Sequence, residues 1–271
     1  MLDPGEACDD GNIDDGDGCP SGPVGACQGE AVCGDGLVWT GVESCDDGNG
    51  GDNDACPSGI GACLAGAICG DGFIWTGEED CEDGNLEDLD GCSNACATPR
   101  WVFISSTQTD GIIGGVAGAD ALCQGYAEAA GLSGTYQAWL SQDAESAPAF
   151  RFGSTSFKGW YLQPTVPPTP VAQGWDDLTG KNEDNKNNYL RNAINADEFG
   201  NLLGETGVWS NTGADGFQHE FGVDCNDRAE IPLELSGSYG LSRSDVLTTS
   251  WSHVSAIECN VMHRLYCFQT G

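Results

Sequence analysis

The sequence predicts a small disulfide-rich repeat region followed by a compact α+β domain. Three observations lead to this prediction. The first 99 residues hold 23 Asp and Glu and eleven cysteines, but no Lys or Arg. Within them, cysteine-containing phrases recur at a spacing of about 36 residues. From Arg100 onward the composition becomes that of an ordinary globular domain with four further cysteines.

Charge excludes several classes of partner. The formal net charge of the 271 residues is −34, and −23 of it falls on the first 99 residues. A field of this sign repels phosphate backbones and anionic headgroups, so we expect no nucleic acid partner. Divalent cations are better candidates, because they offset the self-repulsion of clustered carboxylates.

The cysteine content indicates an oxidising compartment. Residues 1–99 have too few large apolar side chains to fold on a core alone, so their cysteines are expected to form disulfides. We therefore predict a secreted, extracellular or cell-surface location. No apolar run approaches the roughly 20 residues of a membrane helix, so no membrane insertion is expected. Met1 leads directly into Leu2-Asp3-Pro4, which predicts a mature or trimmed fragment.

The first region contains an internal repeat. The segment 33–41 returns as the segment 69–77, and the phrase Cys-Asp/Glu-Asp-Gly-Asn begins at Cys8, Cys45 and Cys81. We assign a truncated repeat to 1–32, repeats to 33–68 and 69–97, and a separate domain to 100–271. Four cysteines in a repeat allow three pairings, and the sequence leaves these open. The first copy has only three, so one is expected to lack a partner or to pair with another chain.

Each repeat carries one set of oxygen-bearing side chains at fixed spacing. The sets are Asp10, Asn12, Asp15 and Asp17; Asp47, Asn49, Asp52 and Asp54; and Asp83, Asn85, Asp88 and Asp90. Calcium accepts six to eight such oxygens in flexible geometry, whereas magnesium demands stricter geometry, so the spacing predicts Ca2+ as the cofactor. The sets are not EF-hands, because the required glycine and final Glu are absent. The alternative is that these are solvated loop residues on a disulfide frame.

These motifs resemble the cysteine-rich repeat of myxobacterial and related secreted proteins, which is loosely similar to the calcium-binding Lin-12/Notch repeat. The resemblance covers residues 1–97. It implies extracellular display and spacing of a neighbouring domain, and it implies no catalysis.

Several elements are expected in the second domain. A strand is predicted at 101–105, and a helix at 117–130, with Ala121, Leu122, Tyr126 and Ala129 near one face and Gly131 as its cap. Residues 138–140 indicate a short strand or turn. The proline-rich segment 163–174 and the Asn-rich segment 181–192 are predicted loops. Later strands are expected near 208–209, 250–251 and 264–268.

The order of the last four cysteines resembles that of the C-type lectin-like fold. The segments 113–123, 138–141 and 264–268 are similar to a bacterial secreted domain of unassigned function, related to the endostatin-type branch of that fold. The resemblance implies disulfides Cys123–Cys267 and Cys225–Cys259. The full expectation is therefore small disulfide-rich calcium-binding repeats followed by an α+β C-type lectin-like domain.

The usual lectin sugar site is not reproduced. Gln163-Pro164-Thr165 lies far before Cys225, and Cys225-Asn226-Asp227 lacks the Trp of the family motif. Asp224, Asn226 and Asp227 fit either a residual cation site or, preferably, a loop turn. Five aromatic residues fit either a saccharide-stacking surface or, preferably, a core. They are Trp160, Tyr161, Trp175, Trp209 and Trp251.

No enzyme signature is present. The chain has three histidines and lacks the zinc-protease, nucleophile-elbow, phosphate-loop and haem-attachment motifs. We therefore expect no enzymatic activity. The predicted function is an extracellular calcium-binding structural or adhesive protein, whose partners are other extracellular proteins or its own copies, assembled at the cell surface. The alternative is a carbohydrate-binding lectin module that binds glycans.

Overall fold

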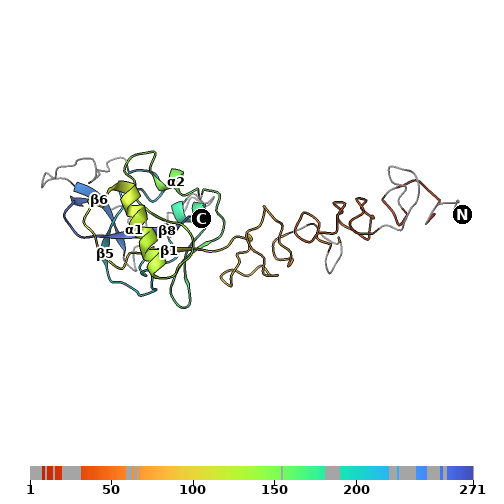
Figure 1. The fold of residues 1–271 in the computed structure, drawn as a ribbon, viewed down its shortest axis with the longest axis horizontal. Coiled ribbons are helices and arrows are strands. Elements are labelled where there is room, and N and C mark those ends of the chain that lie inside the picture. Colours follow the sequence, from red (N-terminus) through yellow and green to blue (C-terminus); the bar gives the residue numbers. More distant parts are fainter. Residues whose placement is uncertain are drawn as a thin grey trace. The chain divides into compact units, whose positions relative to one another are not determined.

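The chain divides into two units, Met1–Thr98 and Pro99–Gly271. This computed structural model describes residues 8–9, 11–14, 16–19, 32–58, 63, 66, 68–153, 155–180, 190–219, 225, 236–242, 251–252 and 255–270. The helices and strands given below belong to the second unit, whereas the described part of the first unit consists of turns, bends and isolated bridges (Figure 1). The chain is thus a disulfide-rich region followed by a mixed, sheet-rich domain.

The first unit is organised around its disulfides. Among its described residues, the buried apolar ones are cysteines, such as Cys56, Cys63 and Cys96, and Ala97, whereas large apolar side chains such as Ile74 and Leu86 are exposed. A chain with so little buried apolar surface depends on cross-links for its stability.

Two glycines in equivalent repeat positions allow the chain to pack closely. Gly34 has φ +92°, and a Cβ there would lie 2.4 Å from the carbonyl oxygen of Asn49. Gly70 has φ +90°, and its Cβ would lie 2.9 Å from the carbonyl oxygen of Asn85. Both the left-handed backbone and the short contact require glycine.

The second unit contains one mixed sheet with the strand order β4-β3-β1-β8-β5-β6-β7, and β2 pairs with β8. Central strand β8 is antiparallel to β1 and parallel to β5, while β1 is parallel to β3. The strands are β1 (Arg100–Ile104), β2 (Tyr136–Ala138), β3 (Trp160–Gln163), β4 (Thr169–Gln173), β5 (Thr206–Trp209), β6 (Ser236–Ser242), β7 (Ser255–Glu258) and β8 (Arg264–Gln269).

In the part of the second unit that the structure describes, three helices accompany the sheet, and the longest is joined to it by a disulfide. They are α1 (Gly115–Ala129), α2 (Pro148–Arg151) and α3 (Gly174–Thr179). Cys123 of α1 bonds to Cys267 of β8, and Cys225 bonds to Cys259. These are the two disulfides that the lectin-like resemblance implies. No helix in the described part of the chain is long and apolar enough to cross a membrane.

The face of α1 that packs on the sheet differs from the prediction. The buried residues are Gly115, Val116, Ala119, Cys123 and Ala127. Of the four residues predicted to lie near one face of the helix, Ala121 and Ala129 are exposed, and Leu122 and Tyr126 are half-buried. The disulfide and the small residues on its side of the helix determine which face meets the sheet, so the bulkier side chains lie at the edge.

An aromatic cluster fills the rest of the core. Fully buried Trp139 lies with its ring centroid 4.9 Å from that of Trp251 and 5.2 Å from that of Phe268. Trp175 and Phe152 complete the cluster at 5.8 and 5.9 Å.

Two further predictions about secondary structure need correction. The segment 163–174, predicted as a surface loop, contains strand β4, in which Val171 and Ala172 are fully buried. Trp251, predicted to lie in a strand, is buried outside the strands. Most of the predicted loop at 181–192 and residue 250 lie outside the described residues.

Candidate cation-binding loops

The disulfides divide the second and third repeats into an inner and an outer loop, and the first repeat has the inner bond. The inner bonds, Cys8–Cys19, Cys45–Cys56 and Cys81–Cys92, each join cysteines eleven positions apart. The outer bonds are Cys33–Cys63 and Cys69–Cys96. Of the three possible pairings, the structure therefore has first with fourth and second with third. Cys27, the remaining cysteine, lies outside the described residues. We call the inner segments 8–19, 45–56 and 81–92 the acidic loops.

An asparagine crosses each acidic loop. The side-chain Nδ2 of Asn12 donates to Asp17 Oδ2 at 2.9 Å, and that of Asn85 donates to Asp90 Oδ2 at 3.2 Å. In the second loop, the neighbouring Asn49 side chain is the main reason that the pKa of Asp54 lies below its ordinary value. The same asparagine–aspartate pair therefore recurs in all three loops, and the first and third loops have a direct hydrogen bond between the two side chains.

The other end of the asparagine amide holds the backbone. Asn12 Oδ1 accepts the N–H of Asp14 at 2.6 Å, and Asn49 Oδ1 accepts the N–H of Gly51 at the same distance. Asn85 Oδ1 accepts the N–H of Glu87 at 2.5 Å. These are Asx turns, which fix the path of the chain without a helix or strand.

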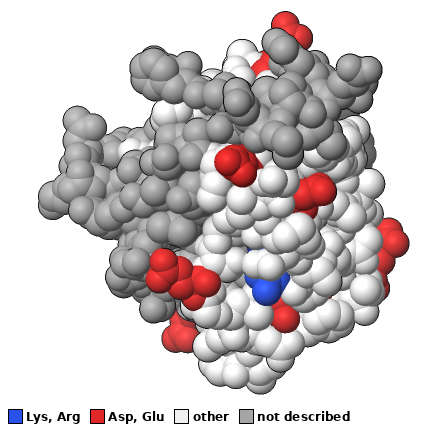
Figure 2. All heavy atoms as spheres, turned by 90° about the vertical axis from the view of Figure 1, so that its left-hand side faces the viewer, with Lys and Arg blue, Asp and Glu red and all other residues white. Residues whose placement is uncertain are grey.

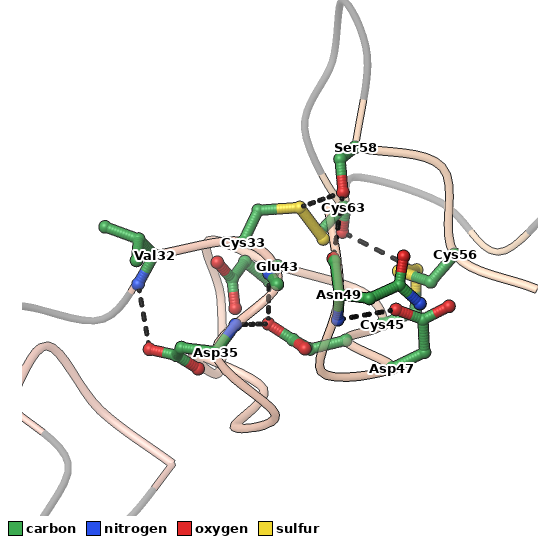
Figure 3. Close-up of a disulfide and its surroundings, with 12 residues drawn as sticks. Val32, Cys33, Asp35, Glu43, Cys45, Asp47, Asn49, Cys56, Ser58 and Cys63 are labelled. Carbon is green, nitrogen blue, oxygen red and sulfur yellow. Dashed lines mark hydrogen bonds between the residues drawn. A yellow bond between two sulfur atoms is a disulfide. The ribbon is translucent and has the colours of Figure 1, made fainter. Parts of the chain in front are cut away.

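The aspartates of each set also bind backbone. Oδ1 of Asp47 and of Asp83 accepts the N–H two residues ahead, at 3.2 and 3.3 Å. Asp54 Oδ1 accepts the N–H of Cys56 at 3.3 Å, beside the Cys45–Cys56 disulfide. Figure 3 shows Asp47, Asn49 and this disulfide close to the Cys33–Cys63 bond. Asp88 Oδ1 accepts the N–H of Asn94 at 3.1 Å.

The predicted calcium ligands thus lie in one loop per repeat without forming a closed carboxylate cage. Asp52 is exposed, and Asp10 and Asp15 lie outside the described residues. Among the described His, Cys, Asp and Glu, one group of three brings its ligand atoms within 4.8 Å of one another, and it is Cys69, Glu82 and Cys96. Because those two sulfurs are bonded to each other, that group is a disulfide beside a carboxylate.

The acid that follows the second cysteine of each repeat has a structural role that the sequence analysis missed. Asp46 accepts the N–H groups of Gly34, Asp35, Gly36 and Gly48 at 2.7 to 3.2 Å. Its equivalent Glu82 accepts those of Gly70 and Gly84. Partial burial raises the pKa of Asp46, but the four N–H donors outweigh it and hold the pKa below its ordinary value.

A second missed acid holds the tryptophan segment. Glu43 Oε2 accepts the N–H of Trp39 at 3.0 Å, and Glu79 Oε2 accepts that of Trp75 at 2.8 Å. Glu43 is buried. The signal was available in the sequence, because Glu43 and Glu79 recur 36 residues apart, as do Asp46 and Glu82.

Neighbouring repeats meet through one recurring contact. The N–H of Thr40 donates to the carbonyl of Gly16 at 2.8 Å, and that of Thr76 donates to the carbonyl of Asn53 at 3.1 Å. These acceptors occupy equivalent positions in consecutive acidic loops. At the first contact, a Cβ on Gly18 would lie 3.0 Å from the indole of Trp39. The tryptophan segment of one repeat therefore packs on the acidic loop of the repeat before it.

The second unit does not present the aromatic surface considered from the sequence. Trp160, Trp175, Trp209 and Trp251 are each at most 3% exposed, and Tyr161 is fully buried. The preferred interpretation of these residues as core is confirmed. Asp224, Asn226 and Asp227 lie outside the described residues.

One part of the chain matches a known family model. A family model described as "Domain of unknown function (DUF4215)" matches residues 60–97. This segment contains the third cysteine-rich repeat, with the disulfides Cys69–Cys96 and Cys81–Cys92. No curated protein matches the chain.

Proposed function

We propose that this protein is an extracellular structural or adhesive protein, in which calcium-binding, disulfide-framed repeats present a lectin-like interaction domain. The observation that carries the proposal is the threefold recurrence of one acidic loop. Each copy has a disulfide between cysteines eleven positions apart and the same Asx turn, and the first and third copies also have the same Asn-to-Asp side-chain hydrogen bond. Loops that differ in most intervening residues keep their oxygen-bearing side chains.

The chemistry of these side chains fits a hard cation. Each loop offers carboxylate and amide oxygens on a short, cross-linked backbone, which are donors that calcium takes in flexible geometry. In the second loop, the carboxyl of Asp47 lies near enough to Asp54 to contribute to its lowered pKa. The carboxylates of a set would have to turn toward one another around the ion, so binding is expected to change their side-chain rotamers.

The proposed location follows from the chemistry of the frame. The seven disulfides among the described residues need an oxidising environment to form and persist. The absence of a membrane-spanning helix in the described residues is compatible with a secreted protein. We assign no catalytic role, because the sequence carries none of the enzyme motifs sought.

The proposal is tested by NMR on the intact chain during calcium titration. We expect the Nδ2–H signals of Asn12, Asn49 and Asn85 to shift together, because their aspartate acceptors become calcium ligands. Asn192, whose amide donates to the carbonyl of Pro170, serves as an internal control. If the three asparagine signals move no more than that of Asn192, the acidic loops are not calcium sites.

A further inference from the structure

Two exposed phenylalanines lie against each other in the second unit. The side chains of Phe150 and Phe217 are 63% and 37% exposed, so two apolar rings face solvent. Their ring centroids are 5.5 Å apart with an interplanar angle of 75°. Phe150 belongs to α2 and Phe217 to the loop after β5, so the fold brings them together from distant parts of the chain.

Several contacts join the two segments that carry this pair. The N–H of Ala149 donates to the carbonyl of Gly216 at 2.9 Å, which joins α2 directly to the loop. Gly216 has φ +82° and packs so closely on buried Trp175 that a Cβ would lie 2.7 Å from its ring. Gln218 Nε2 donates to the carbonyl of Gln142 at 3.3 Å, which joins the turn before α2 to the same loop. A preorganised pair loses little entropy when it binds a partner.

Among the described residues of the two segments that carry the pair, 142–152 and 210–219, the exposed charged side chains are all negative. Asp143 and Glu145 are exposed on the turn before α2, and Asp215 is exposed two residues before Phe217. The basic residue of α2, Arg151, is half-buried and is bound to Asp120 at 2.8 Å, to the carbonyl of Ala138 at 2.7 Å and to the carbonyl of Ser146. Excess acid is general to this unit, and the face drawn in Figure 2 shows more Asp and Glu than Lys and Arg among its described residues.

We propose that Phe150 and Phe217, together with Asp143, Glu145 and Asp215, form a docking site for a basic protein segment that places an Arg or Lys side chain on the rings. Aromatic faces attract such cations, and neighbouring carboxylates strengthen the attraction. The chain uses this contact internally, because the Arg191 guanidinium lies 4.4 Å from the Trp160 ring centroid. A protein of net charge −34 also steers basic partners toward itself. The inference rests on the proposed function in treating the second unit as the interaction domain.

The test is an NMR titration of the intact chain with a short peptide of alternating arginine, leucine and lysine, and with a peptide in which glutamate replaces the basic residues. We expect the ring signals of Phe150 and Phe217 to shift with the basic peptide alone. Phe150→Ser should weaken this binding roughly three- to five-fold. Phe199→Ser is the matched control, since Phe199 is 56% exposed elsewhere on the same unit.

Several outcomes would overturn the proposal. Unchanged ring signals while the peptide binds other acids would do so, as would equal weakening by both substitutions. Ring shifts with a neutral oligosaccharide instead of the basic peptide would show that the site takes glycans. Repeating the titration with calcium and with a chelator separates this result from calcium binding, because the rings belong to the second unit and the acidic loops to the first.

Discussion

At the scale of single residues, many acids of this chain have a structural task before any ligand is considered. Asp46, Glu43 and the aspartates of the acidic loops accept backbone N–H groups that no helix or strand satisfies. Buried or partly buried N–H groups are costly when they lack a partner. The dense negative charge of the repeats therefore stabilises the local backbone as well as offering oxygens to a cation.

Asp46→Asn should loosen the loop that begins at Cys33. The substitution replaces one carboxylate oxygen by an NH2 group, which donates hydrogen bonds and cannot accept them. The N–H groups of Gly34 and Gly36, which bond to different oxygens of Asp46, therefore cannot both keep their acceptors. We expect their amide hydrogens to exchange about tenfold faster, measured by NMR under native conditions. Asp47→Asn is the control, since Asp47 accepts one N–H of its own loop. Equal exchange in both variants would contradict the role assigned to Asp46.

His263 should make the second unit sensitive to mild acid. It is buried beside Trp209, with ring centroids 4.9 Å apart, and burial lowers its pKa below the ordinary 6.5. The contribution of neutral His263 to the free energy of unfolding is therefore complete above pH 6.5, and it is lost as the pH falls toward the lower folded-state pKa.

We expect the melting temperature to fall between pH 7.5 and 5.5, and His263→Gln to reduce that fall. Thermal unfolding of the wild type and the variant at both pH values measures the two differences in melting temperature. A variant that keeps the full wild-type difference would show that another group is responsible.

At the scale of elements, glycines determine whether the repeats can pack their loops. Gly34 and Gly41 both have φ near +90°, but only Gly34 has a backbone atom within reach of a Cβ. Gly34→Ala should prevent the contact with Asn49 and scramble the Cys33–Cys63 and Cys45–Cys56 pairs on oxidative refolding. Gly41→Ala should cost only about 1 kcal/mol of backbone strain and refold with native pairs. Disulfide mapping by mass spectrometry distinguishes them, and equal yields of native pairs would contradict the packing argument.

Local sequence signals predicted some elements of the second unit and missed others. Strands β1 and β8 and helix α1 follow from apolar runs and an Ala-rich segment, and the structure places them within two residues of the predicted bounds. Strand β4 was missed because prolines flank and enter it. It lies at the edge of the sheet, where the absent N–H of Pro170 is tolerated beside an irregularity in the β3 pairing.

The acidic loops show the same division between local and long-range information. Their cysteine frame and asparagine–aspartate spacing were visible as a repeat, because each loop is one short stretch of chain. The role of Asp46 was not, since its carboxylate accepts N–H groups ten to twelve residues away in the segment after Cys33. Pairing of the repeat cysteines also required the three-dimensional structure, because spacing alone allows three solutions.

At the scale of the whole molecule, cross-links and charge act against each other. Residues 1–99 carry −23 and little buried apolar surface, so electrostatic repulsion favours expansion while five described disulfides limit it. In the chain-entropy model, a disulfide that closes a loop of about 15 residues stabilises the folded state by roughly 3 kcal/mol. Calcium would offset the remaining repulsion, which gives the repeats a physical reason to bind it.

The most direct test of this account is a calorimetric titration of calcium into the intact, chelator-treated chain, with magnesium as the matched control. We predict about three sites of micromolar to millimolar affinity for calcium, weaker or no heat with magnesium, and a rise in the melting temperature of the repeats. Asn85→Ala should remove one site and leave the others. Absence of calcium heat and of stabilisation, with the disulfides intact, would show that the acidic loops are held by hydrogen bonds and disulfides alone.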